Sequence, residues 1–81
     1  MNRMIYLIFQ LIIINKTIEC RVSKFATLNQ ILCSIQNAMK DELAYDFSQS
    51  MVMDGETLQC LLRSKTIEDA GFGNGKILIV L

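Results

Sequence analysis

The chain contains no histidine among its 81 residues, and it has no excess of either charge. Without histidine, the commonest metal ligand and the usual general base at neutral pH are both missing. Eight acidic and eight basic residues cancel, and no basic stripe is present that could displace counterions from phosphates. We therefore expect no metal site, no cofactor and no nucleic-acid partner.

Cysteine is also scarce, with an odd count and wide spacing. The three cysteines are Cys20, Cys33 and Cys60. This pattern does not fit a disulfide scaffold or a Cys-x-x-Cys metal site. We expect the three residues to be small core or surface residues in a reducing cytoplasm.

The N-terminal region begins like a secretion signal, with Arg3 followed by an apolar run over residues 4–14. This run is much shorter than the roughly 20 residues that span a bilayer. No small-residue cleavage site follows it. We therefore predict a buried strand here, and a cytoplasmic protein without membrane insertion.

Residues 4–14 and 17–24 predict a β-hairpin with a two-residue turn at Asn15-Lys16. Side chains alternate along strands, so the predicted turn also predicts which residues share a face. On the inner face it pairs Ile13 with Ile18, Leu11 with Cys20, and Phe9 with Val22. The outer face of the first strand keeps a row of isoleucines: Ile8, Ile12 and Ile14.

A single amphipathic helix follows the hairpin. Thr27 and Gln30 fit a Thr-x-x-Gln capping box, so the helix is predicted to begin after Thr27 and to end near Glu42. Apolar residues then recur at steps of three and four, which indicates one buried stripe. The stripe consists of Leu28, Ile31, Leu32, Ile35, Ala38 and Met39.

The second half of the chain predicts short β-elements. These are a loop over 43–50 anchored by an aromatic residue, strands at 51–53 and 57–62, a helical turn at 66–70 and a strand at 76–81. The last strand is apolar on both faces, which is typical of a central strand. Residues 1–81 are therefore expected to form one α+β domain of order ββαββ-turn-β. Its mixed sheet has four to five strands, with the first and last parallel at its centre and the helix across one face.

In order and spacing, these segments resemble ubiquitin and its relatives over nearly the whole chain. The resemblance runs from Asn15-Lys16-Thr17-Ile18 through Thr27-Leu28 to Ile31 and Ile35. Met53-Asp54-Gly55 and Thr66-Ile67-Glu68-Asp69 fit the turns that precede the later strands of that family. The resemblance implies a β-grasp fold.

Two departures from ubiquitin indicate which of its relatives the chain resembles most. The sequence stops at Leu81 on an apolar strand, without the Gly-Gly that modifiers and sulfur carriers need, and the segment between Gly55 and Thr66 is longer than in ubiquitin. In both respects the chain looks more like the YukD and EsaB proteins of bacterial type VII secretion systems. That implies a cytoplasmic accessory or regulatory factor that is not conjugated to other proteins. The alternatives are a truncated ubiquitin-type modifier or sulfur carrier, and a β-grasp domain of a larger protein.

The expected working surface is apolar. Ubiquitin's exposed apolar patch corresponds here roughly to Ile13 or its neighbour, Val52 and Val80, beside the outer isoleucine row. Exposed apolar patches beyond a few hundred Å² tend to be binding sites. The candidate surface for a protein partner or a homodimer is therefore Ile8, Ile12, Ile14, Val52 and Val80. We expect no catalytic residues, because the acid pairs Asp41-Glu42 and Glu68-Asp69 are adjacent on helix ends and point in different directions.

Overall fold

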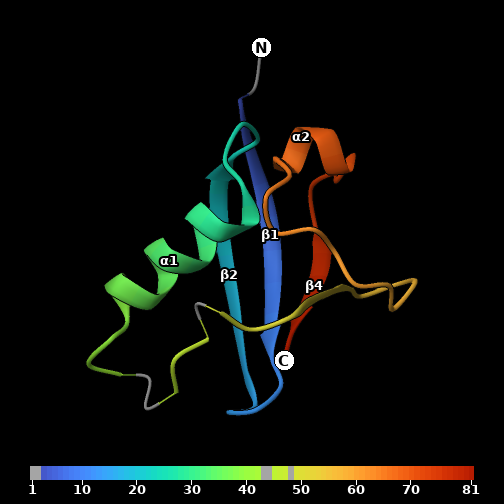
Figure 1. Cartoon of the computed structure of the whole chain (residues 1–81). Helices are drawn as coiled ribbons and strands as arrows, with labels where there is room; N and C mark the ends of the chain where they lie inside the picture. The colour runs from blue at the N-terminus through green and yellow to red at the C-terminus, as the bar shows by residue number, and fades with distance from the viewer. Residues whose placement is uncertain (1–2, 43–44, 48) are drawn as a thin grey trace.

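The computed structural model describes residues 3–42, 45–47 and 49–81. In chain order the elements are β1 (Met4–Leu11), β2 (Lys16–Ser23), α1 (Leu28–Ala38), β3 (Val52–Asp54), α2 (Ile67–Ala70) and β4 (Lys76–Val80). In the described part of the chain, the strands form one mixed sheet of order β2-β1-β4-β3, and α1 lies on one face of it (Figure 1). The predicted α+β fold class is confirmed.

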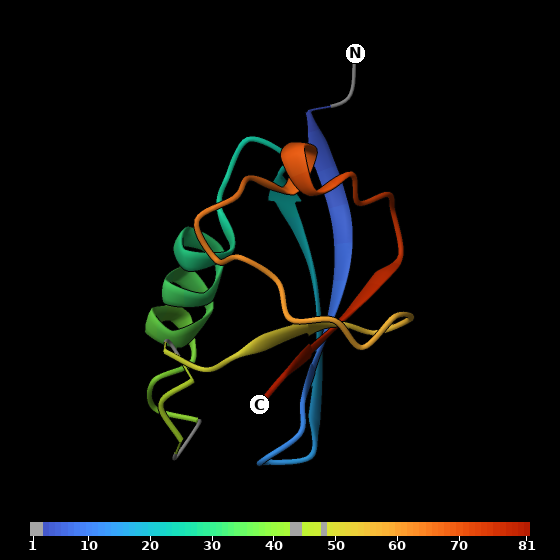
Figure 2. The same ribbon diagram turned by 45° about the vertical axis from the view of Figure 1, so that its right-hand side comes forward.

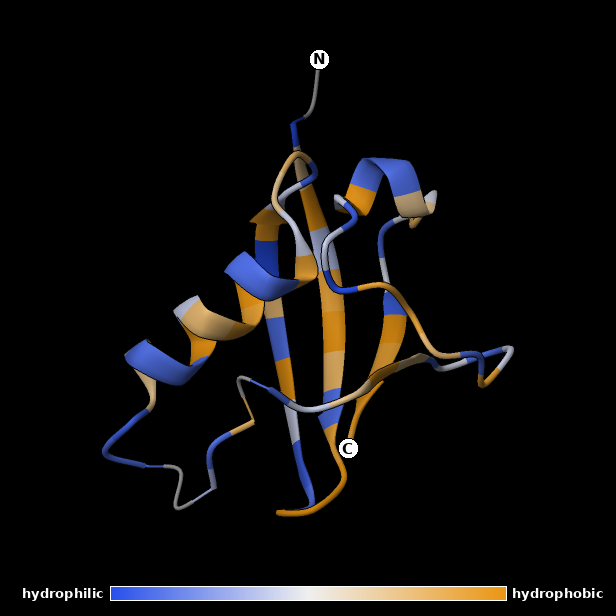
Figure 3. Ribbon diagram, in the orientation of Figure 1, coloured by the Kyte–Doolittle hydropathy of each residue, from blue (hydrophilic) through white to orange (hydrophobic). Residues whose placement is uncertain are grey.

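The two central strands are the first and the last. β1 and β4 run parallel, with Phe9 opposite Leu78 and Leu11 opposite Val80. Figure 3 shows that both strands are predominantly hydrophobic along their length, and this property led to the prediction that they are the central strands. The turned view in Figure 2 shows the C-terminal strand beside β1, with α1 standing off the sheet.

The hairpin forms, but the predicted turn is wrong. β1 pairs with β2 in a register that places Leu7 opposite Cys20 and Phe9 opposite Ile18. β1 ends at Leu11, and residues 12–15 make a longer turn closed by a bond from the Asn15 N–H to the Ile12 carbonyl (3.1 Å). Asn15 takes a left-handed conformation (φ 53°), which asparagine tolerates better than most residues. Because the register moves by an even number of residues, the inner-face assignment survives within β1 and β2, but Ile13, which was predicted to face inward, lies in the turn and is 61% exposed.

The predicted capping box of α1 is confirmed. The Thr27 hydroxyl accepts from the Gln30 N–H (3.1 Å), and the Gln30 side-chain oxygen accepts from the Thr27 N–H (2.9 Å). The helix ends at Ala38 and not near Glu42, because Met39 leaves helical geometry with φ −117°. The first turns provide the buried face of the helix, with Leu28, Ile31 and Leu32.

Within the predicted loop over 43–50, residues 43, 44 and 48 lie outside the described part of the structure. The aromatic anchor is Phe47, whose side chain is 1% exposed. Its N–H donates to the side-chain oxygen of Gln36 on α1 (2.9 Å). This contact ties Phe47 to the helix.

The predicted strand over 57–62 is wrong. An isolated bridge between Cys60 and Met53 forms there instead of a strand. Two backbone bonds join this segment to β3, from the Leu61 N–H to the Val52 carbonyl (2.9 Å) and from the Asp54 N–H to the Gln59 carbonyl (2.9 Å). Leu58 has φ 60°, outside the extended region, and this interrupts the strand. The helical turn at 66–70 is confirmed as α2, which Thr66 caps and Gly71 ends in the left-handed conformation.

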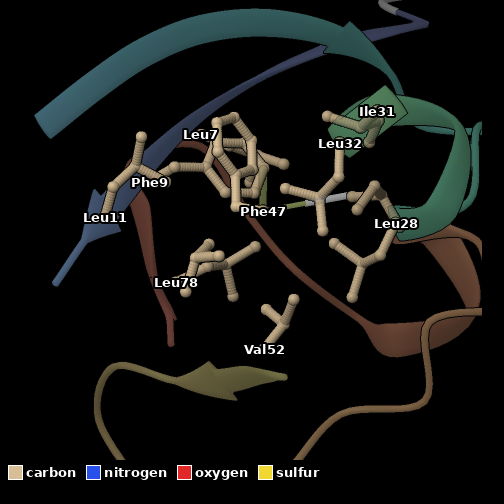
Figure 4. Close-up of a cluster of buried hydrophobic side chains, with 11 residues drawn as sticks. Leu7, Phe9, Leu11, Leu28, Ile31, Leu32, Phe47, Val52 and Leu78 are labelled. Atoms are coloured by element: carbon tan, nitrogen blue, oxygen red, sulfur yellow. The ribbon is translucent and has the colours of Figure 1, made fainter. Parts of the chain in front are cut away.

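One core holds these elements together. Figure 4 shows side chains from β1, α1 and β4 converging with Phe47 and Val52 between the sheet and the helix. The buried apolar residues are Leu7, Phe9, Leu11, Leu28, Ile31, Leu32, Phe47, Val52, Ile67, Leu78 and Val80.

Candidate protein-interaction surface

Three of the five predicted surface residues belong to the core or pack against it. Val52 and Val80 pair with each other across β3 and β4, and they are 0% and 2% exposed. Both lie on the inner face of the sheet, because Val80 is also opposite the buried Leu11. Ile14 is half-buried in the turn after β1 and packs against the core. Ile8 and Ile12 remain from the predicted set.

The outer face of the sheet nevertheless carries a group of apolar side chains, which Gln10 interrupts on β1 opposite Ile79. Ile8 on β1 lies opposite Ile77 on β4, and Ile79 follows two residues later on the same strand. Ile12 continues the line of β1, since its N–H donates to the Val80 carbonyl (3.1 Å). We call these residues, with Leu81, the outer apolar patch: Ile8, Ile12, Ile77, Ile79 and Leu81.

The patch is accessible to a partner. Ile12 is 50% exposed, and Ile77 and Leu81 are each 38% exposed. Ile8 and Ile79 are half-buried between them. Leu81 is held in place by a bond from its N–H to the Met51 carbonyl (2.9 Å).

Sequence reasoning missed the β4 half of this patch. Both alternating sets of β4 are apolar, so hydrophobic periodicity does not show whether Leu78 and Val80 or Ile77 and Ile79 face the helix. That choice depends on the register with β1, which places Leu78 beside Phe9. No local signal in the sequence reports this register.

Polar residues border the patch on the β2 side. Glu19 lies opposite Ile8, and Thr17 lies opposite Gln10. The hydroxyl of Tyr6 is hydrogen-bonded to the Glu19 carboxylate, and this bond is the main reason why the pKa of Tyr6 is raised. An apolar centre with a polar rim is the usual anatomy of a protein interface.

An ion pair lies on the opposite, inner face of the sheet, at the edge of the core. The Lys76 ammonium is 2.9 Å from one carboxylate oxygen of Asp54, and both side chains are mostly buried. The other carboxylate oxygen accepts from the N–H groups of Glu56 (2.7 Å) and Thr57 (3.2 Å). The hydrogen bond to Lys76, followed by the bond from Glu56, lowers the pKa of Asp54, and the Asp54 bond raises the pKa of Lys76.

This arrangement predicts how stability depends on pH. A carboxyl group with a lowered pKa in the folded state stabilises the protein above its unfolded pKa of about 3.9, and that contribution is lost as the pH falls through the folded value. Asp54→Asn should therefore shift the denaturation midpoint down at neutral pH and much less at strongly acidic pH. Urea titrations at several pH values measure the difference.

The exposed neighbour Glu56 provides the control for this experiment. Its carboxylate is 3.8 Å from the Lys76 ammonium, with a side chain that is 80% exposed. Glu56→Gln should have little effect at any pH, because exposed ion pairs contribute little. A midpoint difference for Asp54→Asn that stays constant from neutral to acidic pH would show that the ion pair does not stabilise the fold.

Among the residues that the structure describes, every helix is too short or too polar to span a bilayer. No group of three or more cysteine, aspartate or glutamate side chains there is placed to hold a metal ion. All three cysteines are free thiols.

Comparison with known proteins identifies the fold. The sequence matches no protein-family model and no curated protein. A de novo designed protein based on ubiquitin superposes with a TM-score of 0.76 at 12% identity, covering 100% of this chain and 90% of the design. Ubiquitin of Caldiarchaeum subterraneum superposes with a TM-score of 0.72 at 18% identity, covering 95% of this chain and 90% of the archaeal protein. The chain therefore has a ubiquitin-like β-grasp fold.

Proposed function

We propose that this ubiquitin-like chain is a non-catalytic protein that works by binding other proteins through its outer apolar patch. The observation that carries the proposal is the cluster of apolar side chains on the face of the sheet opposite α1. Exposed apolar surface is costly in water, so a group of such residues across two central strands favours a binding role. A second copy of the chain and a different protein are both compatible with this surface.

The resemblance to YukD and EsaB makes the proposal more specific. It suggests a cytoplasmic accessory or regulatory component of a type VII secretion system that acts without conjugation. In the genome that encodes this chain, we expect neighbouring genes for a secretion ATPase and for small helical-hairpin substrates. A genome without such a system would contradict the secretion role and leave the binding role open.

Substitutions in the patch should separate binding from folding. The double variant Ile12→Asp with Ile77→Thr removes apolar surface at both ends of the patch and keeps a β-branched residue within β4. In cells that carry this variant in place of the native protein, secretion of the helical-hairpin substrates should fall by about tenfold or more, as expected when interface anchors are lost. Immunoblots of culture medium and cells measure the secreted fraction.

The matched control is Phe25→Asp, because Phe25 is 51% exposed in the turn between β2 and α1, away from the patch. It should leave secretion unchanged. The thermal midpoints of all variants must be compared first, so that a loss of fold is not mistaken for a loss of binding. Normal secretion by a folded double variant would rule out the patch as the working surface.

The absence of conjugation is tested separately by intact mass spectrometry of the protein recovered from cells. We expect the mass of the free chain. A species with the added mass of a second protein, joined by an isopeptide bond, would favour a ubiquitin-type modifier.

A further inference from the structure

Three sulfur-bearing side chains share the outer face of the sheet at β3: Met51, Met53 and Cys60. Met53 pairs with Ile79 of the outer apolar patch, so its side chain lies on that face. Met51 comes two residues earlier, and the bond from the Leu81 N–H to its carbonyl continues the same ladder, so its side chain shares the face. Cys60 is opposite Met53 in the isolated bridge, which places its side chain there too.

The backbone brings Met53 and Cys60 close together. The two backbone bonds that join residues 59–61 to β3 lie on either side of the bridge, so Met53 and Cys60 form a non-hydrogen-bonded antiparallel pair. Such pairs have the shorter separation in a ladder, with Cα atoms about 4.5 Å apart, and their side chains are closer. The Cys60 thiol is therefore held beside Met53 by the fold.

The same thiol contacts the other methionine. The Cys60 thiol donates to the Met51 thioether, with 3.3 Å between the two sulfur atoms. Cys60 is exposed, Met51 is 53% exposed and Met53 is half-buried. An ion in solution can therefore reach the sulfur atoms without any opening of the core.

These donors favour a soft monovalent metal ion. Thiolate and thioether ligands select Cu(I), whereas zinc sites are almost always four-coordinate and use cysteine, histidine or carboxylate ligands. Two thioethers are neutral, so a single thiolate neutralises one positive charge and leaves a divalent ion uncompensated. The expectation of no metal site depended on histidine and on cysteine spacing, and it did not take methionine into account.

The geometry needs only a small adjustment to hold an ion. A metal–sulfur bond is about 2.3 Å long, so three sulfur atoms around one ion in a plane lie about 4 Å apart. The distance between the Cys60 and Met51 sulfur atoms is 3.3 Å. Methionine is unbranched and has three rotatable bonds, so its exposed thioether can move outward by this difference.

We infer that Met51, Met53 and Cys60 form a binding site for one Cu(I) ion. On binding, the Cys60 thiol releases its proton to the solvent and its sulfur bonds to the metal as a thiolate. The two thioethers donate lone pairs and lose no proton. The ion enters and stays as Cu(I), so the step needs no oxidant or reductant.

The rival interpretation is that the two methionines only enlarge the apolar surface beside the outer apolar patch. Leucine separates the two interpretations, because it replaces methionine with similar volume and polarity and without the thioether. The double variant Met51→Leu with Met53→Leu therefore keeps the apolar surface and removes two of the three donors.

Competition for Cu(I) tests the site. The probe is Cu(I) supplied as its coloured bicinchoninate complex, with ascorbate and without oxygen, and the protein should withdraw one ion per chain. The double leucine variant should bind Cu(I) about a hundredfold more weakly or worse, since residues that merely support a metal ligand already contribute about ten- to a hundredfold. Met39→Leu is the matched control and should bind as the wild type does, because Met39 follows α1 and packs against the core.

The thiol is tested with its own matched pair. Cys60→Ser should weaken Cu(I) binding by about a hundredfold or more. Cys33 is also an exposed thiol but lies on α1, so Cys33→Ser should have no effect. Thermal midpoints of all variants are compared first, to establish that each is folded.

A spectroscopic measurement locates the ion independently of affinity. Ag(I) is a soft monovalent ion that ascorbate and oxygen do not change under these conditions, and it serves as the probe for NMR. The chain has five methionines, so their ε-methyl signals can be followed individually. Ag(I) should shift the signals of Met51 and Met53 and leave that of Met39 in place. The outer-patch variant Ile12→Asp with Ile77→Thr should give the same shifts, so this test is independent of the proposed function.

Four results would overturn the inference. Equal Cu(I) affinity of the wild type and the double leucine variant would show that cysteine alone binds the ion. Methyl shifts that spare Met51 and Met53 would place the ion elsewhere. One ion per two chains, with a doubled mass in sedimentation, would assign these sulfur atoms to a metal bridge between copies. Tighter binding of Zn(II) than of Cu(I) would contradict the choice of metal.

Discussion

Val52→Asp should leave the protein unfolded at neutral pH. Val52 is fully buried, pairs with Val80 and belongs to the apolar core beneath α1. An ionised carboxylate there would lose its hydration among apolar core side chains, and burying a charge in such surroundings costs more than most single substitutions. A domain of this size has a total stability of only about 5–15 kcal/mol. Circular dichroism and the dispersion of amide NMR signals measure the loss of fold.

Two other substitutions show whether charge burial causes the unfolding. Ile12→Asp places the same carboxylate on a residue that is 50% exposed, and it should leave the fold intact. Val52→Thr keeps the shape but buries a hydroxyl, so it should lower the thermal midpoint without unfolding the protein. A folded Val52→Asp protein with a midpoint close to that of the wild type would mean that Val52 is accessible, as the sequence had suggested.

Features set by local chemistry could be predicted from the sequence. The capping box needs only Thr27 and Gln30, because both of its bonds join residues within one turn. The left-handed Gly71 likewise ends α2 through bonds to its own last turn. The central position of β1 and β4 was also predictable, since strands with two apolar faces must be covered on both sides.

Features set by unusual local backbone conformations or by long-range register could not be predicted. The hairpin turn moved because Asn15 adopts the left-handed conformation and closes a longer turn than expected. The strand predicted after Gly55 does not form because Leu58 leaves the extended region, and the pattern of apolar residues does not indicate that change. Val52 and Val80 were predicted at the surface for a related reason. β3 is too short, and β4 is apolar on both faces, so neither strand shows an alternation of polar and apolar residues that would mark its buried face.

These errors also explain which part of the predicted surface survived. Ile8 and Ile12 belong to β1 and its turn, whose inner face is marked by the alternation of polar and apolar residues on β2. The partners of Ile8 and Ile12 on β4 became visible only through the parallel register of the two central strands. The outer apolar patch is therefore half predictable from the sequence, and its other half follows from tertiary pairing.

Phe47→Ala should destabilise the protein by about 3–5 kcal/mol, the usual cost of truncating a buried phenylalanine. The side chain is 1% exposed and lies in the core with residues of β1 and α1 (Figure 4). Although Phe47 belongs to no helix or strand, it fills space that the short helix and the sheet leave between them. The substitution keeps the Phe47 N–H that donates to Gln36, but it removes the ring that holds this N–H in position. Urea denaturation followed by circular dichroism measures the change, because the chain has no tryptophan to serve as a fluorescence probe.

The neighbouring aromatic residue provides the matched control. Tyr45 lies two residues earlier and is 36% exposed, so Tyr45→Ala should cost about 1 kcal/mol or less. A Phe47→Ala variant that loses no more stability than Tyr45→Ala would show that Phe47 is not part of the core. The large difference expected instead would make Phe47 a structural element of the fold, although it belongs to no helix or strand.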